Sequence, residues 1–359
     1  MGRASARFSQ PSYSDLGTDQ ALEPLWPAHT DPPLESWHRR REVLRKDWED
    51  ALGVSSYDPF DPGEELVDAY ELPDWSARVF RQPTSPTTRQ LVLVMIPRRM
   101  VRSPCAAVVI PFYHPDSMAG YDLEHKQPIL DSPITQFGRH LVEQGYAVAC
   151  AEAFPFNTVP APQNDGSFAW WQAASEKLLR ENPKWTGMGK LVWDTRLATD
   201  LLLKQPEVDP SRLAIMGHSL GGKMAFYAAC LDDRIRAAIA SDFGFGYSFS
   251  NWDAPWYLGS KLRDPAFHLQ HHHLLALCAP RAFFLIAGDC DGPASWQYIL
   301  AAQSVYRLYG REEAVGCFDH GTGHPPTEES LAWAYRWLGE QMDLPPVDWA
   351  LHDIVGDGP

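Results

Sequence analysis

The chain has 359 residues, of which 45% are hydrophobic and 21% charged, and its formal net charge is −15. This composition is typical of a globular protein, and the length fits either one domain with insertions or two small domains. The negative charge argues against nucleic-acid binding, because it repels phosphate backbones, and the lack of any run of 18 apolar residues argues against a membrane-spanning helix.

Residues 1–75 predict an N-terminal arm that contains one helix. The first residues, MGRASARFSQPSYSD, lack the apolar core of a signal peptide, so we expect a cytoplasmic protein. Over residues 36–52, Trp37, Trp48 and two leucines are spaced at multiples of about 3.6 residues, which predicts a helix. Because one helix cannot bury such a face by itself, we expect the arm to pack on the main domain or on a second subunit of a homo-oligomer.

Residues 76–345 predict one domain of alternating strands and helices. We expect strands at 89–96, 106–110, 146–151, 213–216, 235–240, 282–287 and 314–318, and helices at 134–144, 191–204, 223–231, 295–308 and 327–338. The continuous apolar runs in these strands are typical of strands buried on both faces. The alternation specifies the α/β class: a mostly parallel central sheet flanked by helices, followed here by a C-terminal tail at 346–359.

The segment Gly217-His-Ser-Leu-Gly221 lies between a predicted strand and a predicted helix. This is the context of a nucleophile elbow, a tight turn that raises a serine hydroxyl above the sheet at the N-terminus of a helix. Glycines are needed there because side chains would collide with the strand or the helix. We therefore predict that Ser219 is a nucleophile and that His218 is a packing residue. A glycine-rich turn with an idle serine is the alternative.

A serine hydroxyl needs a histidine to accept its proton and a carboxylate to orient that histidine, each at the end of a later strand. Asp289 and Asp291 follow the predicted strand at 282–287, and the pattern Gly-x-x-Asp favours Asp291 as the acid. We expect Asp289 to brace the loop, and it is an alternative acid. Asp242, directly after the strand at 235–240, is a third candidate. An Asx turn is the structural alternative for Asp291.

Two histidines follow the last predicted strand. His324 sits on a glycine-flanked loop just ahead of the closing helix, so it can reach back toward Ser219, and we expect it to be the base. His320 lies closer to the strand. We expect His320 to fix the loop, and it is an alternative base.

The tetrahedral intermediate of acyl transfer needs two N–H donors for its oxyanion. One should be Leu220, the residue after the nucleophile. The other should come from the loop that follows the strand at 106–110. Pro111 has no N–H, so Phe112 or Tyr113 must donate.

Two insertions rich in aromatic residues interrupt the alternation, at about 154–189 and 243–267. Both follow strands, so both should overhang Ser219, and long loops in compact domains are usually functional. We expect a substrate pocket lined by Trp252, Trp256 and Tyr257, with Trp193 from the helix at 191–204. The alternative is that these residues only pack around the rim of the core.

We expect no metal and no other cofactor. His268 and the histidines at 271–273 form an apparent cluster, but adjacent histidines point in different directions, and no carboxylate or cysteine ligands lie nearby. A helix leading into residues 274–280 is the preferred interpretation. The six cysteines are scattered without a CxxC pair, which indicates buried free thiols in a reducing compartment.

Together these segments resemble the α/β-hydrolase superfamily and, within it, the acetyl xylan esterase and dienelactone hydrolase-like branch. The resemblance covers about residues 85–340. It is carried by Val-Asp-Pro-Ser-Arg at 208–212, Gly-His-Ser-Leu-Gly-Gly at 217–222, Ala-Pro-Arg at 279–281, Gly288-x-x-Asp291 and Gly323-His324.

The resemblance implies the α/β-hydrolase fold and a cofactor-free serine hydrolase. Such an enzyme would cleave a carboxylic ester of a small molecule, of short-chain or acetyl type, through an acyl-enzyme. Dienelactone hydrolases usually carry cysteine as nucleophile, so Ser219 favours esterase chemistry. Members of the superfamily share a fold without sharing a substrate. The alternatives are hydrolysis of an amide, thioester or carbon–carbon bond with the same three residues, and a non-catalytic scaffold.

Overall fold

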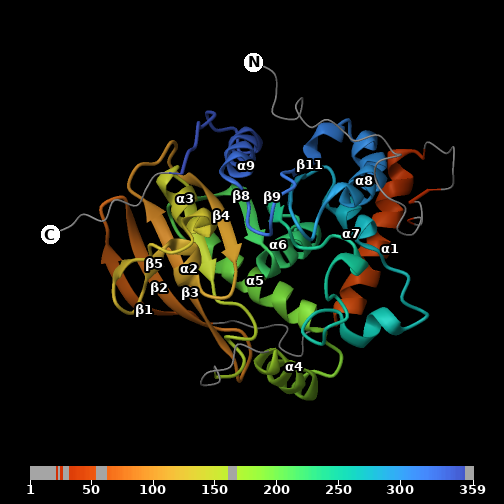
Figure 1. The fold of residues 1–359 in the computed structure, drawn as a ribbon, viewed down its shortest axis with the longest axis horizontal. Helices are drawn as coiled ribbons and strands as arrows, with labels where there is room; N and C mark the ends of the chain where they lie inside the picture. The colour runs from red at the N-terminus through yellow and green to blue at the C-terminus, as the bar shows by residue number, and fades with distance from the viewer. Residues whose placement is uncertain (1–21, 23–24, 27–31, 54–62, 161–167, 352–359) are drawn as a thin grey trace.

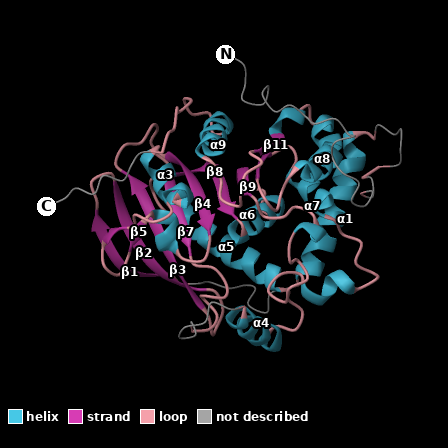
Figure 2. Ribbon diagram, viewed as in Figure 1, coloured by secondary structure: helices cyan, strands magenta, loops and turns pink. Residues whose placement is uncertain are grey.

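A nine-stranded sheet forms the centre of the structure, a computed structural model that describes residues 22, 25–26, 32–53, 63–160 and 168–351 (Figure 1; Figure 2). Its strand order is β1-β2-β3-β7-β4-β8-β9-β10-β11. The strands are β1 (Glu65–Glu71), β2 (Trp75–Pro83), β3 (Arg89–Pro97), β4 (Cys105–Pro111), β7 (Ala147–Ala151), β8 (Val208–His218), β9 (Ile235–Ser241), β10 (Ala282–Ala287) and β11 (Val315–Asp319). The short strands β5 (Tyr121–Asp122) and β6 (Gln127–Pro128) pair separately.

The six strands from β7 to β11 in this order pair in parallel, whereas β1, β2 and β3 are antiparallel. The α/β class with a mostly parallel sheet is therefore confirmed. Every residue of β4 and of β10 is buried, as their continuous apolar runs indicated. The edge strand β1 is not among the strands that the sequence predicts. It is largely exposed and lacks an apolar pattern, so pairing with β2 rather than burial makes it a strand.

Helices cover both faces of the sheet. They are α1 (Leu34–Leu52), α2 (Pro115–Ala119), α3 (Phe137–Glu143), α4 (Ala169–Glu181), α5 (Gly187–Leu203), α6 (Leu220–Leu231), α7 (His271–Cys278), α8 (Trp296–Leu308) and α9 (Glu328–Gln341). α3 and α9 lie on one face, joined by a hydrogen bond between His140 and Tyr335, and α5 and α6 pack on the other. α4 lies inside the first insertion and is not among the helices that the sequence predicts.

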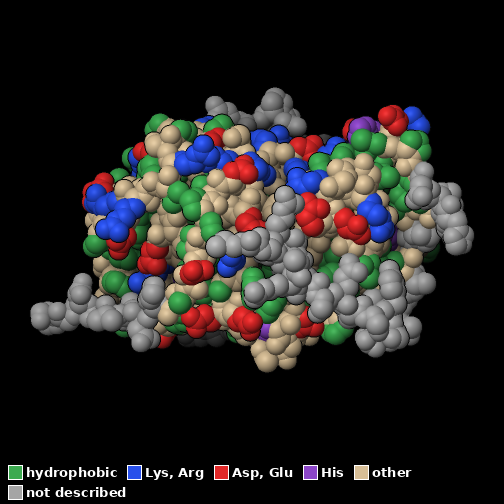
Figure 3. All heavy atoms as spheres, turned by 90° about the horizontal axis from the view of Figure 1, so that it is seen from above, with side chains coloured by type: hydrophobic (Ala, Val, Ile, Leu, Met, Phe, Trp, Pro, Cys, Tyr) green, Lys and Arg blue, Asp and Glu red, His purple; other side chains and the backbone are tan. Residues whose placement is uncertain are grey.

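The arm helix α1 packs on the main domain, which was one of the two expectations for it. Its Trp48 ring is buried, stacks on His271 of α7 and meets Tyr227 of α6 edge-on at 5.5 Å. Arg41 pairs with Asp233 at 2.6 Å beside this contact. None of the described helices is long and apolar enough to span a bilayer. On the face shown in Figure 3, acidic and basic side chains are interspersed.

Candidate active site

The turn after β8 has the geometry of a nucleophile elbow. Ser219 has φ 54° and ψ −116°, a strained conformation for a residue with a side chain, and its N–H donates to Ser241 O at 2.8 Å. A Cβ at Gly217 would lie 2.0 Å from Gly221 O, and a Cβ at Gly221 would lie 2.4 Å from Pro111 O. Both glycines are therefore required by the close approach of strand, turn and helix, as the sequence predicted.

His324 and Asp242 form the hydrogen-bonded pair of the site. His324 Nδ1 lies 2.5 Å from Asp242 Oδ2, and Asp242 is fully buried whereas the His324 side chain is 40% exposed. The His324 ring also lies 4.5 Å, centroid to centroid, from that of His218, the residue before Ser219. The Ser219 hydroxyl makes no hydrogen bond to the side chains of the described residues, and such bonds are often long when no substrate is bound.

The other carboxylate oxygen of Asp242 is held by the loop after β10. Asp242 Oδ1 accepts from the N–H groups of Gly288, Cys290 and Asp291 at 3.0, 3.0 and 2.8 Å. Burial raises the pKa of Asp242, but the His324 hydrogen bond and these N–H groups outweigh burial and hold its pKa below the usual value. The carboxylate is thus kept ionised and aimed at His324.

The prediction that Asp291 orients His324 is wrong. Asp291 is fully buried, and its carboxylate accepts hydrogen bonds from the N–H groups of residues 243–245 and from the Ser295 hydroxyl. It braces the start of the second insertion instead. Asp289 is exposed and braces the loop through its N–H, which donates to Gly323 O. Asp242 and Asp291 lie in the loops that follow the neighbouring strands β9 and β10, so only the loop conformations decide which carboxylate meets the histidine.

The remaining histidines near Ser219 have other partners. His320 Nδ1 hydrogen-bonds with Thr322 Oγ1 at 3.0 Å, so it fixes the loop, as expected. His218 Nδ1 lies 3.1 Å from Ser241 Oγ. Burial lowers the pKa of His218 to about 4, which keeps it neutral and makes it a packing residue, again as expected.

The N–H groups of Leu220 and Tyr113 are the candidate donors to an oxyanion. Leu220 is the first residue of α6, where an N–H has no partner within the helix and the helix dipole is positive. The Phe112 N–H donates to Ala151 O at 3.2 Å, so the prediction that Phe112 could be the second donor is wrong. Among the described residues, no acceptor is found for the Tyr113 N–H, so Tyr113 is the remaining candidate for the second donor.

The two insertions contact each other through aromatic side chains. Trp256 of the second insertion contacts Trp171 and Phe168 of the first, with ring centroids 5.9 and 5.1 Å apart. Trp252 was expected to line the substrate pocket, and this is wrong. Its ring is completely buried, and its Nε1–H donates to Gly244 O at 2.7 Å, so it belongs to the core of the insertion.

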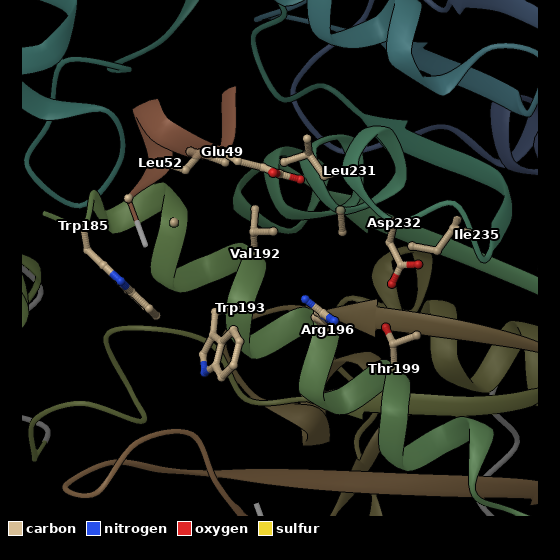
Figure 4. Close-up of a pocket in the computed structure, with 13 residues that line it drawn as sticks. Glu49, Leu52, Trp185, Val192, Trp193, Arg196, Thr199, Leu231, Asp232 and Ile235 are labelled. Atoms are coloured by element: carbon tan, nitrogen blue, oxygen red, sulfur yellow. The ribbon is translucent and has the colours of Figure 1, made fainter. Parts of the chain in front are cut away.

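Trp193 does not belong to this site either. With Trp185 it lines a separate cavity of about 320 Å³ between the end of α1, α5 and the end of α6 (Figure 4). Ser219 lies at the opposite end of α6, and none of the residues that line the cavity comes from the pair or the elbow. The expectation that Trp193 contributes to the substrate pocket is therefore wrong.

Lys223, one helical turn after Ser219, was not singled out from the sequence. It is buried, its ammonium donates to Phe243 O and to Ser250 Oγ, and it lies 4.7 Å from the Trp252 ring centroid. Burial lowers its pKa to about 8. The position of Lys223 directly after the glycines of the elbow was the feature that could have identified it. Its contacts show that it connects α6 to the second insertion.

A metal could be held by Asp242, Cys290 and His324, which bring one donor atom each within 4.8 Å of one another. Two of these atoms already form the hydrogen bond of the pair. The histidines at 271–273 lie in α7, as expected, and His271 hydrogen-bonds with the Tyr227 hydroxyl and Phe245 O. All six cysteines are free thiols, and five of them are buried.

Known proteins share this architecture. Residues 126–251 match the profile of the dienelactone hydrolase family. YtaP of Bacillus subtilis (strain 168), which carries the name of a hydrolase, is 27% identical over 260 residues, or 67% of this chain and 81% of YtaP. A glucuronoyl esterase from Solibacter usitatus superposes with a TM-score of 0.65 at 17% identity, over 88% of this chain and 98% of that one.

Acetyl Xylan Esterase 1 from Thermoanaerobacterium sp. JW/SL YS485 has a TM-score of 0.50 at 15% identity, over 87% of this chain and 95% of that one. At such identities the solved structures establish the shared fold. The chain thus has the α/β-hydrolase fold, and its similarity to the dienelactone hydrolase and acetyl xylan esterase branch of that superfamily, expected from the elbow and the segments around it, is confirmed.

Proposed function

We propose that the chain is a serine hydrolase that cleaves carboxylic esters through an acyl-enzyme. The observation that carries this proposal is the hydrogen bond between His324 and the buried carboxylate of Asp242, at the same sheet edge as the strained Ser219. A serine hydroxyl becomes nucleophilic only when a histidine accepts its proton, and that histidine must be held in the right tautomer. The Asp242 carboxylate holds the proton on His324 Nδ1 and leaves Nε2 free to act as a base.

In the first step, Ser219 Oγ attacks the acyl carbon and its proton passes to His324 Nε2. Asp242 stabilises the imidazolium, while the N–H groups of Leu220 and Tyr113 donate to the oxyanion. His324 then gives the proton to the leaving alcohol oxygen as the ester bond breaks. A water molecule, deprotonated by His324 Nε2, attacks the acyl carbon of the acyl-enzyme. His324 then gives this proton to Ser219 Oγ as the acyl–serine bond breaks, which releases the acid and restores the serine hydroxyl.

We further propose a carbohydrate ester as the substrate, rather than an ester of an unrelated small molecule. Two of the proteins that share the fold are named for glucuronoyl and acetyl xylan esters. The half-buried aromatic side chains of Tyr113 and Trp171 beside the elbow suit the apolar face of a sugar ring.

The direct test is Ser219→Ala. We expect its turnover of p-nitrophenyl acetate to fall by several orders of magnitude and its labelling by a fluorophosphonate probe to disappear. Ser260→Ala, at an exposed serine outside the site, is the matched control and should behave as wild type. Wild-type turnover in Ser219→Ala would remove the mechanism. Normal labelling with uniformly feeble turnover of a panel of acyl esters would instead indicate cleavage of an amide, thioester or carbon–carbon bond.

A further inference from the structure

A row of aromatic rings begins at the elbow. A Cβ at Gly221 would lie 3.0 Å from Cδ2 of Phe112, so that ring touches the turn that holds Ser219. The Phe112 ring lies 4.3 Å from Tyr113, and Tyr113 lies 5.5 Å from Trp171, both distances between centroids. These rings are half-buried, and together they connect the elbow to the first insertion, in which Trp171 lies.

The row ends at an exposed phenylalanine. Trp171 contacts Trp256, and the Phe168 ring stacks on Trp256 with centroids 5.1 Å apart and planes only 13° from parallel. Phe168 is 63% exposed, whereas Trp256 is 8% exposed. Stacking uses one face of the Phe168 ring, so the exposed area includes its other face.

The surroundings hold this stacked pair in place. A Cβ at Gly187, the first residue of α5, would lie 2.2 Å from the Trp256 carbonyl carbon, so the start of α5 is packed directly on the Trp256 backbone. Trp171 supports the Trp256 ring from the side of the elbow. A rigid aromatic ring with one open face loses little conformational entropy when a ligand stacks on it.

We propose that the outer face of Phe168, stacked on Trp256, is a binding subsite for a ring of the ester substrate distant from the bond that is cleaved. The ligand it fits is a flat apolar ring face, either an aromatic ring or the C–H face of a pyranose. The subsite is continuous with the candidate active site through the aromatic row. That the bound ring belongs to the substrate rests on the proposed function. That a ring binds at Phe168 does not depend on it.

Binding is measured first, on the full-length Ser219→Ala protein, by calorimetric titration with xylotetraose and, separately, with 4-phenylbenzyl alcohol. Adding Phe168→Ala should weaken binding of at least one probe by about three- to tenfold, the size of one stacking contact. Phe168→Tyr should restore the affinity. Leu179→Ala, at an exposed apolar residue of α4, is the control and should leave it unchanged. Unaltered binding in Phe168→Ala, or no binding of either probe, overturns the subsite.

Kinetics then separate the subsite from the proposed function. With acetylated xylotetraose, Phe168→Ala should raise KM about three- to tenfold and leave kcat unchanged, while p-nitrophenyl acetate, which has no further ring beyond its leaving group, should be hydrolysed as by wild type. An equal loss on both esters contradicts the subsite. If wild-type protein hydrolyses neither ester, the proposed function fails, and the binding titration alone decides the subsite.

Discussion

Asp242 and Asp291 each hold the loop that carries the other. The N–H of Asp291 donates to Asp242 Oδ1 at 2.8 Å, and the Asp291 carboxylate accepts from the N–H groups of residues 243–245, directly after Asp242. The loops after β9 and β10 are thereby locked together. These hydrogen bonds direct the Asp242 carboxylate to His324 and the Asp291 carboxylate to the backbone at the start of the second insertion.

Changing each aspartate to asparagine should therefore have different effects on catalysis. Asp242→Asn no longer holds the proton on His324 Nδ1, so we expect kcat to fall about 10³- to 10⁴-fold, in addition to a loss of stability like that of Asp291→Asn, because Asp242 also accepts from three backbone N–H groups. Asp291→Asn should lower the free energy of unfolding by about 1–3 kcal/mol, because backbone N–H groups lose a charged acceptor. Esterase assays and thermal melts measure both. A larger kcat loss for Asp291→Asn would restore Asp291 as the orienting acid.

The glycines of the elbow offer a steric test. Gly221→Ala would place a Cβ 2.4 Å from Pro111 O, so either the turn or β4 must move. We expect a loss of about 1–3 kcal/mol in the free energy of unfolding, as for overpacked cores, together with a loss of kcat. Gly292→Ala is the matched control, since nothing lies within 4 Å of its Cβ position. Equal chemical-denaturation midpoints for the two variants would show that the turn is not this tight.

The arm helix should contribute to the stability of the main domain. Trp48→Ala removes a fully buried ring from the contact between α1 and α7, and we expect a loss of about 3–5 kcal/mol in the free energy of unfolding. Val43→Ala, on the exposed side of the same helix, should change it by less than about 0.5 kcal/mol. Urea titrations of the two variants measure the difference, and a Trp48→Ala protein as stable as Val43→Ala would mean that the arm does not stabilise the domain.

Three buried histidines predict a loss of stability in mild acid. Burial lowers the pKa of His140 and His218 to about 4 and that of His271 to about 3. The unfolded chain binds a proton at each near pH 6.5, whereas the native protein does not, so the free energy of unfolding falls as pH drops from 6.5 to 4. Each histidine contributes about 1.4 kcal/mol per pH unit to the slope, or about 4 kcal/mol for the three.

Denaturant titrations at pH 5, 6 and 7 measure this slope. His140→Gln should make the fall shallower, because one of the three protons is removed. His125→Gln is the control: His125 is exposed beside Asp122, which raises its pKa, so the change cannot make the fall shallower. If the free energy of unfolding falls with pH equally steeply in wild type and in His140→Gln, then His140 does not contribute to the acid sensitivity.

Local patterns in the sequence determined the central sheet and the elbow. The apolar runs of β4 and β10 and the helical spacing in α5 and α6 depend on neighbours along the chain, and they correctly predicted the α/β class. The glycines around Ser219 are required by contacts within a single turn. His324 was predicted from its loop, and the structure brings it next to Asp242. The cytoplasmic location, the domain boundaries and a homo-oligomer through the arm stay predictions.

Only the tertiary structure decided which groups meet across loops. Asp242 and Asp291 have the same chemistry and lie in the loops after the adjacent strands β9 and β10, and hydrogen bonds between these two loops select Asp242 for His324. The sequence does not distinguish Trp252 from Trp256, yet Trp252 is buried against Tyr227 of α6 and His271 of α7, whereas Trp256 stacks on Phe168. Side-chain direction in long insertions depends on contacts with distant parts of the chain, and a periodic pattern carries no information about those contacts.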